Sequence, residues 1–161
     1  CYNVGSIDFE INDIQEGNFG GIISAGTKAS ISNSYNCGNI KIKGNATGDF
    51  YIGGAIGNNT GIINNFCNIG NIISDVKVTG NYNYVGAIVS LNNSNGKIEN
   101  TYYLKDTCAN GIEENWGNET DVDTLEIDKI ENMPAILEII GTEFRKDENN
   151  INNGYPILTW Q

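Results

Sequence analysis

The phrase Tyr2-Asn3-Val4-Gly5-Ser6-Ile7 returns as Tyr35-Asn36-Cys37-Gly38-Asn39-Ile40 and again as Cys67-Asn68-Ile69-Gly70-Asn71-Ile72. The copies begin 33 and then 32 residues apart. Two further phrases recur at the same or a similar spacing: Phe19-Gly20-Gly21-Ile22, Ile52-Gly53-Gly54-Ala55 and Val85-Gly86-Ala87-Ile88, and then Ile31-Ser32-Asn33, Ile63-Asn64-Asn65 and Ile98-Glu99-Asn100. Self-similarity at a fixed period of this size is typical of stacked structural units.

Each unit contains short β-branched segments bounded by Gly and Asn, which indicates strands. Apolar and polar residues alternate in Ile40-Lys41-Ile42-Lys43, as expected for a strand with one buried face. We therefore predict a mainly β fold, a right-handed parallel β-helix or β-solenoid of about three 32–33-residue coils, because parallel crossovers favour right-handed winding. Such a coil is long for three strands and tight turns, so a loop or hairpin should protrude around residues 12–18, 44–49 and 79–83.

Stacking places equivalent residues of successive coils above one another, about 4.8 Å apart. Two isoleucine columns should therefore be buried: Ile7, Ile40 and Ile72, and Ile31, Ile63 and Ile98. Two asparagine columns should form amide ladders along the axis, which would satisfy their inward-facing polar groups: Asn3, Asn36 and Asn68, and Asn33, Asn65 and Asn100.

The repeat pattern breaks near Tyr102, which divides one continuous domain into solenoid repeats over 1–108 and a capping segment over 109–161. In that small α/β cap, a short helix is predicted over 133–140, with Asn132 as N-cap, Pro134 in the first turn and Gly141 just past the end. A final strand is predicted over 155–160, with Tyr155 and Trp160 in the core. An uncovered last coil exposes backbone and core, so residues 101–161 are expected to form its lid.

The repeated phrases resemble the GLUG repeat of bacterial surface and secreted proteins. The resemblance lies in the Tyr-Asn-x-Gly-x-Ile copies, in the Gly-Gly-Ile-type cores and in the closing stretch from Asn152-Asn153-Gly154-Tyr155-Pro156 to Trp160-Gln161. It covers nearly the whole chain and carries over no catalytic residues. It implies an extracellular, cell-surface or secreted bacterial setting. The chain begins in the middle of a repeated phrase, which suggests a fragment that contains the end of a repeat array.

The net charge is −11 and is unevenly distributed. Residues 1–100 hold seven acids and five lysines, whereas residues 101–161 hold thirteen acids and four basic residues. An acidic surface repels phosphate, so nucleic acid is not an expected partner. No apolar run reaches the length of a membrane span, so membrane insertion is not expected either.

Four cysteines, Cys1, Cys37, Cys67 and Cys108, lack the paired spacing of a zinc site. Cys37 shares its repeat position with Val4 and Ile69, which is the behaviour of a small hydrophobic residue. We therefore expect reduced structural thiols and no cofactor.

The absence of histidine excludes Ser–His and Cys–His catalysis and leaves general base work to carboxylates or lysine. No pair of acids recurs between the units at the spacing that glycoside hydrolysis requires. A non-catalytic protein is therefore predicted, and a carboxylate-based polysaccharide-active enzyme stays open as a lesser alternative. Oxygen ligands in the acidic stretch that begins at Asp121 hint at calcium, although the loop glycine is missing; they are Asp121, Asp123, Glu126 and Asp128.

Aromatic residues in or near the loops could stack on carbohydrate or dock a protein: Phe50, Tyr51, Tyr82, Tyr84 and Trp116. The competing interpretation is that Tyr51 and Tyr84 only cover the glycine-rich strands. The leading hypothesis is an adhesion, display or spacer unit of a larger bacterial cell-surface protein, with host or cell-wall glycans or proteins and other domains of the parent chain as partners. The alternative is an accessory carbohydrate-binding module of a secreted carbohydrate-active enzyme or peptidase.

Overall fold

The computed structural model describes residues 1–26, 28–80, 82–128 and 133–161, and shows a mainly β chain wound into about three stacked coils. The first coil comprises β1 (Tyr2–Asn3), β2 (Ile7–Ile14), β3 (Gly17–Gly20) and β4 (Ile23–Gly26). The second comprises β5 (Ser30–Asn36), β6 (Ile40–Ala46), β7 (Phe50–Gly53) and β8 (Ile56–Asn59). The third comprises β9 (Ile62–Asn68), β10 (Ile72–Val78), β11 (Asn83–Gly86) and β12 (Val89–Asn92). The predicted solenoid is confirmed.

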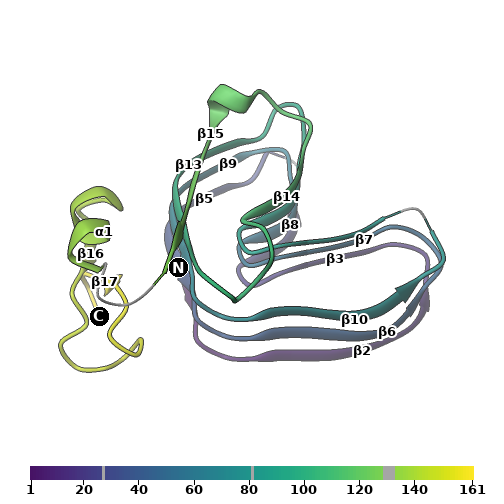
Figure 1. Cartoon of the computed structure of the whole chain (residues 1–161), viewed down its shortest axis with the longest axis horizontal. Helices are drawn as coiled ribbons and strands as arrows, with labels where there is room; N and C mark the ends of the chain where they lie inside the picture. The colour runs from purple at the N-terminus through teal and green to yellow at the C-terminus, as the bar shows by residue number, and fades with distance from the viewer. Residues whose placement is uncertain (27, 81, 129–132) are drawn as a thin grey trace.

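Equivalent strands of successive coils pair in parallel and in register with the repeat. Ile40 pairs with both Ile7 and Ile72, and Ile63 pairs with both Ile31 and Ile98, so the two predicted isoleucine columns exist. The chain turns counter-clockwise in Figure 1 while the coils advance toward the viewer, which is the right-handed winding that was expected.

The coil has an angular outline with two parts (Figure 1). We call the sheet of β2, β6 and β10 and the sheet of β3, β7 and β11 the arm, because they run out together and return. The body consists of the sheet that contains β1, β5 and β9 and the sheet that contains β4, β8 and β12. The hairpin predicted to protrude from each coil is present as this arm, and its strands make it longer than the loops that were expected.

Each part has its own apolar core. The core of the body contains Ile31, Ile56, Ile63, Phe66, Ile88 and Ile98. The core of the arm contains Ile11, Ile40, Ile42, Phe50, Ile52 and Val76. Burial of these columns removes apolar surface from water, at roughly 25 cal/mol per Å².

The asparagine columns form amide ladders inside the stack. Asn3 Nδ2 donates to Asn36 Oδ1 at 2.8 Å, and Asn36 Nδ2 donates to Asn68 Oδ1 at 2.7 Å. Asn65 and Asn100 continue a second predicted ladder from Asn33, and each of its members has φ near +50°. Asparagine tolerates this left-handed conformation better than most residues. A third ladder, which sequence reasoning missed, joins Asn59, Asn92 and Asn115 at 2.8 and 2.9 Å.

The fourth coil omits the arm. It contains β13 (Lys97–Leu104), β14 (Ile112–Asn115), the 3₁₀ helix η1 (Glu119–Asp121) and β15 (Val122–Ile127). β13 and β15 extend the sheet of β5 and β9, and β14 extends the sheet of β8 and β12. The last layer of the arm, formed by β10 and β11, carries polar side chains where the layers below are apolar. Ser74 occupies the column of Phe9 and Ile42, and its Oγ donates to Asn83 Oδ1 at 3.2 Å.

The C-terminal segment corrects the expectation of a single lid over the last coil. Residues 105–127 provide the final layers of the body, whereas α1 (Met133–Ile139), β16 (Phe144–Arg145) and β17 (Ile157–Leu158) pack against the side of the stack (Figure 1). Ile136, Ile140 and Leu158 contact a face of the body that includes Tyr35, Cys67 and Tyr102. This outer face of the β5–β9–β13 sheet is apolar, and the C-terminal segment shields it from water.

The local predictions for this segment hold in part. The helix lies where it was predicted, and Gly141 ends it with φ +114°, whereas the proposed N-cap Asn132 lies outside the described residues. The final strand is shorter than predicted and pairs antiparallel with β16. Trp160 is 67% exposed and leans on Tyr2, so its placement in the core was wrong. Tyr155 is only partly buried, at the margin of the C-terminal cluster.

Candidate functional site

The outer face of the arm sheet formed by β3, β7 and β11 carries a group of tyrosines. Parallel pairing aligns Asn18, Tyr51 and Tyr84 in one column along the axis. The rings of Tyr51 and Tyr84 lie 5.8 Å apart, and Tyr82 stacks on Tyr84 at 4.9 Å. Strand alternation explains the arrangement: Phe50 and Ile52 point into the arm, so Tyr51 between them points out.

A second column, two residues earlier, places carboxylates beside the tyrosines. The Tyr51 hydroxyl donates to Asp49 Oδ2 at 3.4 Å, and the other oxygen of Asp49 accepts the backbone N–H of Tyr82 at 3.2 Å. One coil below, Glu16 accepts a hydrogen bond from the amide of Asn18. These contacts place both acids on the same side of the sheet as the group of rings.

Glycines make the corner where the arm meets the body. A Cβ on Gly53 would lie 2.1 Å from the carbonyl oxygen of Ile56, and one on Gly20 would lie 2.0 Å from that of Ile23. Only glycine permits this close approach of two backbones. The tight turn brings the sheet of β4, β8 and β12 up beside the tyrosine group, so the two sheets enclose an inner corner (Figure 1).

The body wall of the inner corner is polar. A cavity of about 320 Å³ lies between the two sheets, and we call it the amide pocket; it is lined by Asn18, Ala25, Gly26, Asn58, Thr60, Asn93, Ser94 and Asn95. Asn93 Nδ2 donates to Asn58 Oδ1 within it. The Oδ1 of Asn18 is buried and has no hydrogen-bond partner among the described residues.

The inner corner has an acidic electrostatic character. Burial raises the pKa of Tyr51 to about 12, and the nearby carboxylates of Asp49 and Glu16 add to the effect. Loss of solvation is the largest cause that raises the pKa of Tyr84, and the negative charge of Glu114 raises it further. Glu114 pairs in register with Leu91, which in turn pairs with Asn58 of the amide pocket. The rings therefore stay protonated and are surrounded by negative charge.

Two of the five aromatic candidates are not in this group. Phe50 is completely buried in the arm and is unavailable to a ligand, which corrects its assignment as a binding residue. Trp116 is 52% exposed and follows β14, and its backbone N–H donates to the backbone carbonyl oxygen of Asn92. The register places it one layer beyond Asn93, next to the amide pocket rather than among the tyrosines. Tyr51, Tyr82 and Tyr84 are brought together, but Tyr51 is only 7% exposed, so Tyr82 and Tyr84 present the accessible rings.

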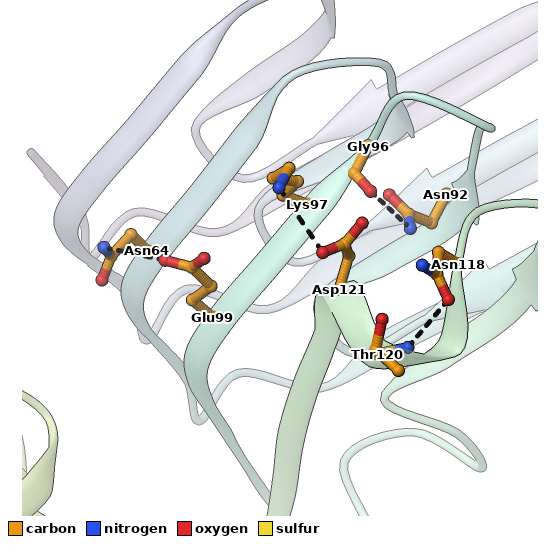
Figure 2. Close-up of polar contacts among 8 residues, drawn as sticks. All are labelled: Asn64, Asn92, Gly96, Lys97, Glu99, Asn118, Thr120 and Asp121. Carbon is orange, nitrogen blue, oxygen red and sulfur yellow. Dashed lines mark hydrogen bonds and ion pairs between the residues drawn. The ribbon is translucent and has the colours of Figure 1, made fainter.

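The acidic stretch is extended along η1 and β15, and its four acids have separate partners. Asp121 pairs with Lys97 at 3.4 Å (Figure 2), and Asp128 pairs with Lys105 at 2.9 Å. Asp123 accepts the backbone N–H of Asn100, and Glu126 bonds Tyr103. The structure does not gather them into one calcium site. Within 1–26, 28–80, 82–128 and 133–161, no cluster of three or more potential metal-ligating His, Cys, Asp or Glu side chains occurs.

The cysteines are free thiols. Burial raises the pKa of Cys67 to about 12 and also raises the pKa values of Cys37 and Cys108, so these three thiols remain protonated at neutral pH. Cys67 contributes to the packing between the body and the C-terminal segment, as expected of a small hydrophobic side chain.

Sequence reasoning missed Asn18, Asn58 and Glu114. Asn18 occupies the repeat position of Tyr51 and Tyr84, and this signal could have revealed it. Glu114 lies in the shortened fourth coil, where the spacing changes, and only the strand register brings it to the inner corner.

No family model, curated protein or solved structure matches this chain. The resemblance to the GLUG repeat therefore stays a prediction based on the repeated phrases. Among the described residues, no helix is both long and apolar enough to cross a membrane.

Proposed function

We propose that this chain is a non-catalytic β-solenoid module of a larger bacterial surface or secreted protein, and that it presents the inner corner to an external ligand. The observation that carries this proposal is the pair of accessible rings, Tyr82 and Tyr84, supported by the buried ring of Tyr51 beside the amide pocket. Aromatic rings supply contact area at small entropic cost, and amide groups supply hydrogen bonds.

Rigidity of the scaffold supports a binding role. Tyr51 and Tyr84 sit on paired strands whose positions are set by the glycine corner and by the ladders behind it. Binding of a ligand therefore costs little conformational entropy at the site, which favours affinity. The same stacking suits a display or spacer unit, because it holds the site at a constant orientation within the parent protein.

The second candidate, an accessory carbohydrate-binding module, is favoured by the same group of rings, because tyrosines beside amides can contact both faces and hydroxyls of sugars. Both candidates predict binding without turnover, at the cell surface or after secretion. The acidic surface opposes nucleic acid as a partner.

A glycan and matrix-protein array with the purified chain tests the proposal. We expect ligands to be retained, Tyr84→Ala to reduce their binding about tenfold, and Trp160→Ala, on the far side of the body, to leave it unchanged. Incubation with the retained ligand should yield no shortened products. Release of sugars or peptides by the isolated chain would overturn the non-catalytic assignment.

A further inference from the structure

We infer that the inner corner binds a linear glycan whose sugars carry protonated amines, such as an oligomer of glucosamine. This inference rests on the binding role proposed above and specifies its ligand. Three features of the corner, namely its exposed rings, its polar lining and its charge, each favour this class.

The exposed rings offer a stacking surface to a flat sugar unit. Tyr51 and Tyr84 belong to neighbouring coils and their ring centroids are 5.8 Å apart. Tyr51 is only 7% exposed and Asn18 takes its place in the first coil, so the rings of Tyr84 and Tyr82 form the accessible surface, with Tyr51 packed against Tyr84. Tyr82 widens this surface by stacking on Tyr84.

The polar lining fits a hydroxylated ring better than an apolar side chain. The amide pocket combines Asn18, Asn58 and Asn93 with Thr60 and Ser94, and its volume of about 320 Å³ exceeds what a few water molecules need. The side-chain amides of Asn58 and Asn93 and the hydroxyls of Thr60 and Ser94 supply donors and acceptors that suit sugar hydroxyls and amines. No large apolar anchor pocket, of the kind a bound peptide would fill, is part of this lining.

The charge distribution selects amines. The carboxylates of Glu16, Asp49 and Glu114 act on the two tyrosines, and no lysine or arginine among the described residues lines the pocket. Lys28 contacts the lining through its backbone N–H, which donates to Thr60 Oγ1. Lys41 and Lys43 form their ion pairs on the opposite sheet of the arm, and Lys97 and Lys105 form theirs on the body. Ammonium groups would be attracted both to these carboxylates and to the tyrosine faces. Anionic sugars would be repelled.

Calorimetric titration of the intact chain tests the inference with a glucosamine hexamer and its fully N-acetylated counterpart. We expect the amine-bearing hexamer to bind at least tenfold more tightly, and to weaken about tenfold when salt rises from about 0.05 to about 0.5 M, because screening shortens the range of exposed charges. Moving from mildly acidic to mildly alkaline pH should weaken only the amine-bearing hexamer, because its amines lose their protons.

Matched variants locate the site. Tyr84→Ala should weaken binding about tenfold, and Tyr84→Phe, which keeps the ring and the fold, should retain it. Glu114→Gln should weaken binding about threefold or more. Glu99→Gln removes the same charge from β13, where Glu99 accepts a bond from Asn64 (Figure 2), and should have no effect. Equal effects of Glu114→Gln and Glu99→Gln would overturn the assignment of the site.

Three outcomes overturn the ligand class. Equal affinity for the acetylated hexamer would overturn the role of the amines, while Tyr84-dependent binding of that hexamer would leave the proposed function intact. A lysine hexapeptide that binds as tightly as the glucosamine hexamer would show charge attraction without glycan recognition. If neither hexamer binds but the array retains ligands of another kind, this inference is rejected while the proposed binding function stands.

Discussion

Ile63 and Ile157 are both fully buried, but their surroundings differ in kind. Ile63 pairs in register with Ile31 below and Ile98 above, so its contacts are with equivalents of itself. Ile157 packs in the C-terminal segment among unlike partners, including Ile140 and Phe144. In a repeat, the contacts of one coil can be predicted from those of the next coil. In the C-terminal segment, the contacts are made by residues that share no sequence pattern. The two regions should therefore respond differently to mutation.

The largest effect is expected from a charge inside an isoleucine column. Ile63→Asp, and likewise Ile40→Asp, buries a carboxylate without a partner, which should cost more than about 4 kcal/mol and unfold the stack. Urea unfolding followed by far-UV circular dichroism measures the loss. Ile73→Asp is the control, because Ile73 is largely exposed and pairs with Lys41. Unchanged melting of Ile63→Asp would remove its column from the core.

A break in an amide ladder should have the next largest effect. Asn36→Ala leaves the amide of Asn3 and the Oδ1 of Asn68 without their partner inside the stack, at a cost of roughly 2–3 kcal/mol. Asn71→Ala, in the exposed pair with Asn39, should cost less than about 0.5 kcal/mol. Equal losses in the two variants would show that the buried ladder contributes no more than a surface contact.

The C-terminal segment should respond to acid before the stack does. Burial opposes ionisation of Asp147, but the backbone N–H groups of Asn152, Ile151 and Gly154 outweigh it and lower its pKa. Its stabilisation is therefore present above the unfolded-state pKa, near 4, and is lost as the pH falls through the lower folded pKa. Asp147→Asn should weaken the segment by about 1–2 kcal/mol and flatten this dependence.

Limited proteolysis across pH 2–6 with an acid-stable protease checks this prediction, since cleavage within 133–161 reports on the segment separately. Cleavage of the coils at the same pH as the segment would contradict the independence of the two regions.

The smallest effect is expected at the surface of the arm. Lys43 and Glu10 form an ion pair at 3.1 Å, and both side chains are largely exposed. Lys43→Met should leave the urea midpoint of unfolding almost unchanged, because solvent and salt screen such pairs. A loss comparable with that of Asn36→Ala would make charge, rather than the ladders, the main stabiliser between coils.

Much of the stack was predictable because its contacts repeat. The period identified the coils, the isoleucine columns and two of the three ladders. It missed the ladder of Asn59, Asn92 and Asn115 because its first-coil position is Gly26 and its last member lies in the degenerate fourth coil. The tyrosines were recognised as candidates, but their grouping was not, since Phe50 and Tyr51 are neighbours in sequence and face opposite ways.

Local sequence determined what depends on spacing along the chain: parallel coils, buried columns, turns at glycine and asparagine, and the short helix before Gly141. The tertiary structure decided what depends on contacts between distant segments. It placed Glu114 near Tyr84, opened the amide pocket between two sheets, and moved residues 133–161 from the end of the stack to its side. The physical reason is that periodic burial can be read one strand at a time, whereas a corner or a docked segment depends on which apolar or polar faces are left uncovered once the coils have formed.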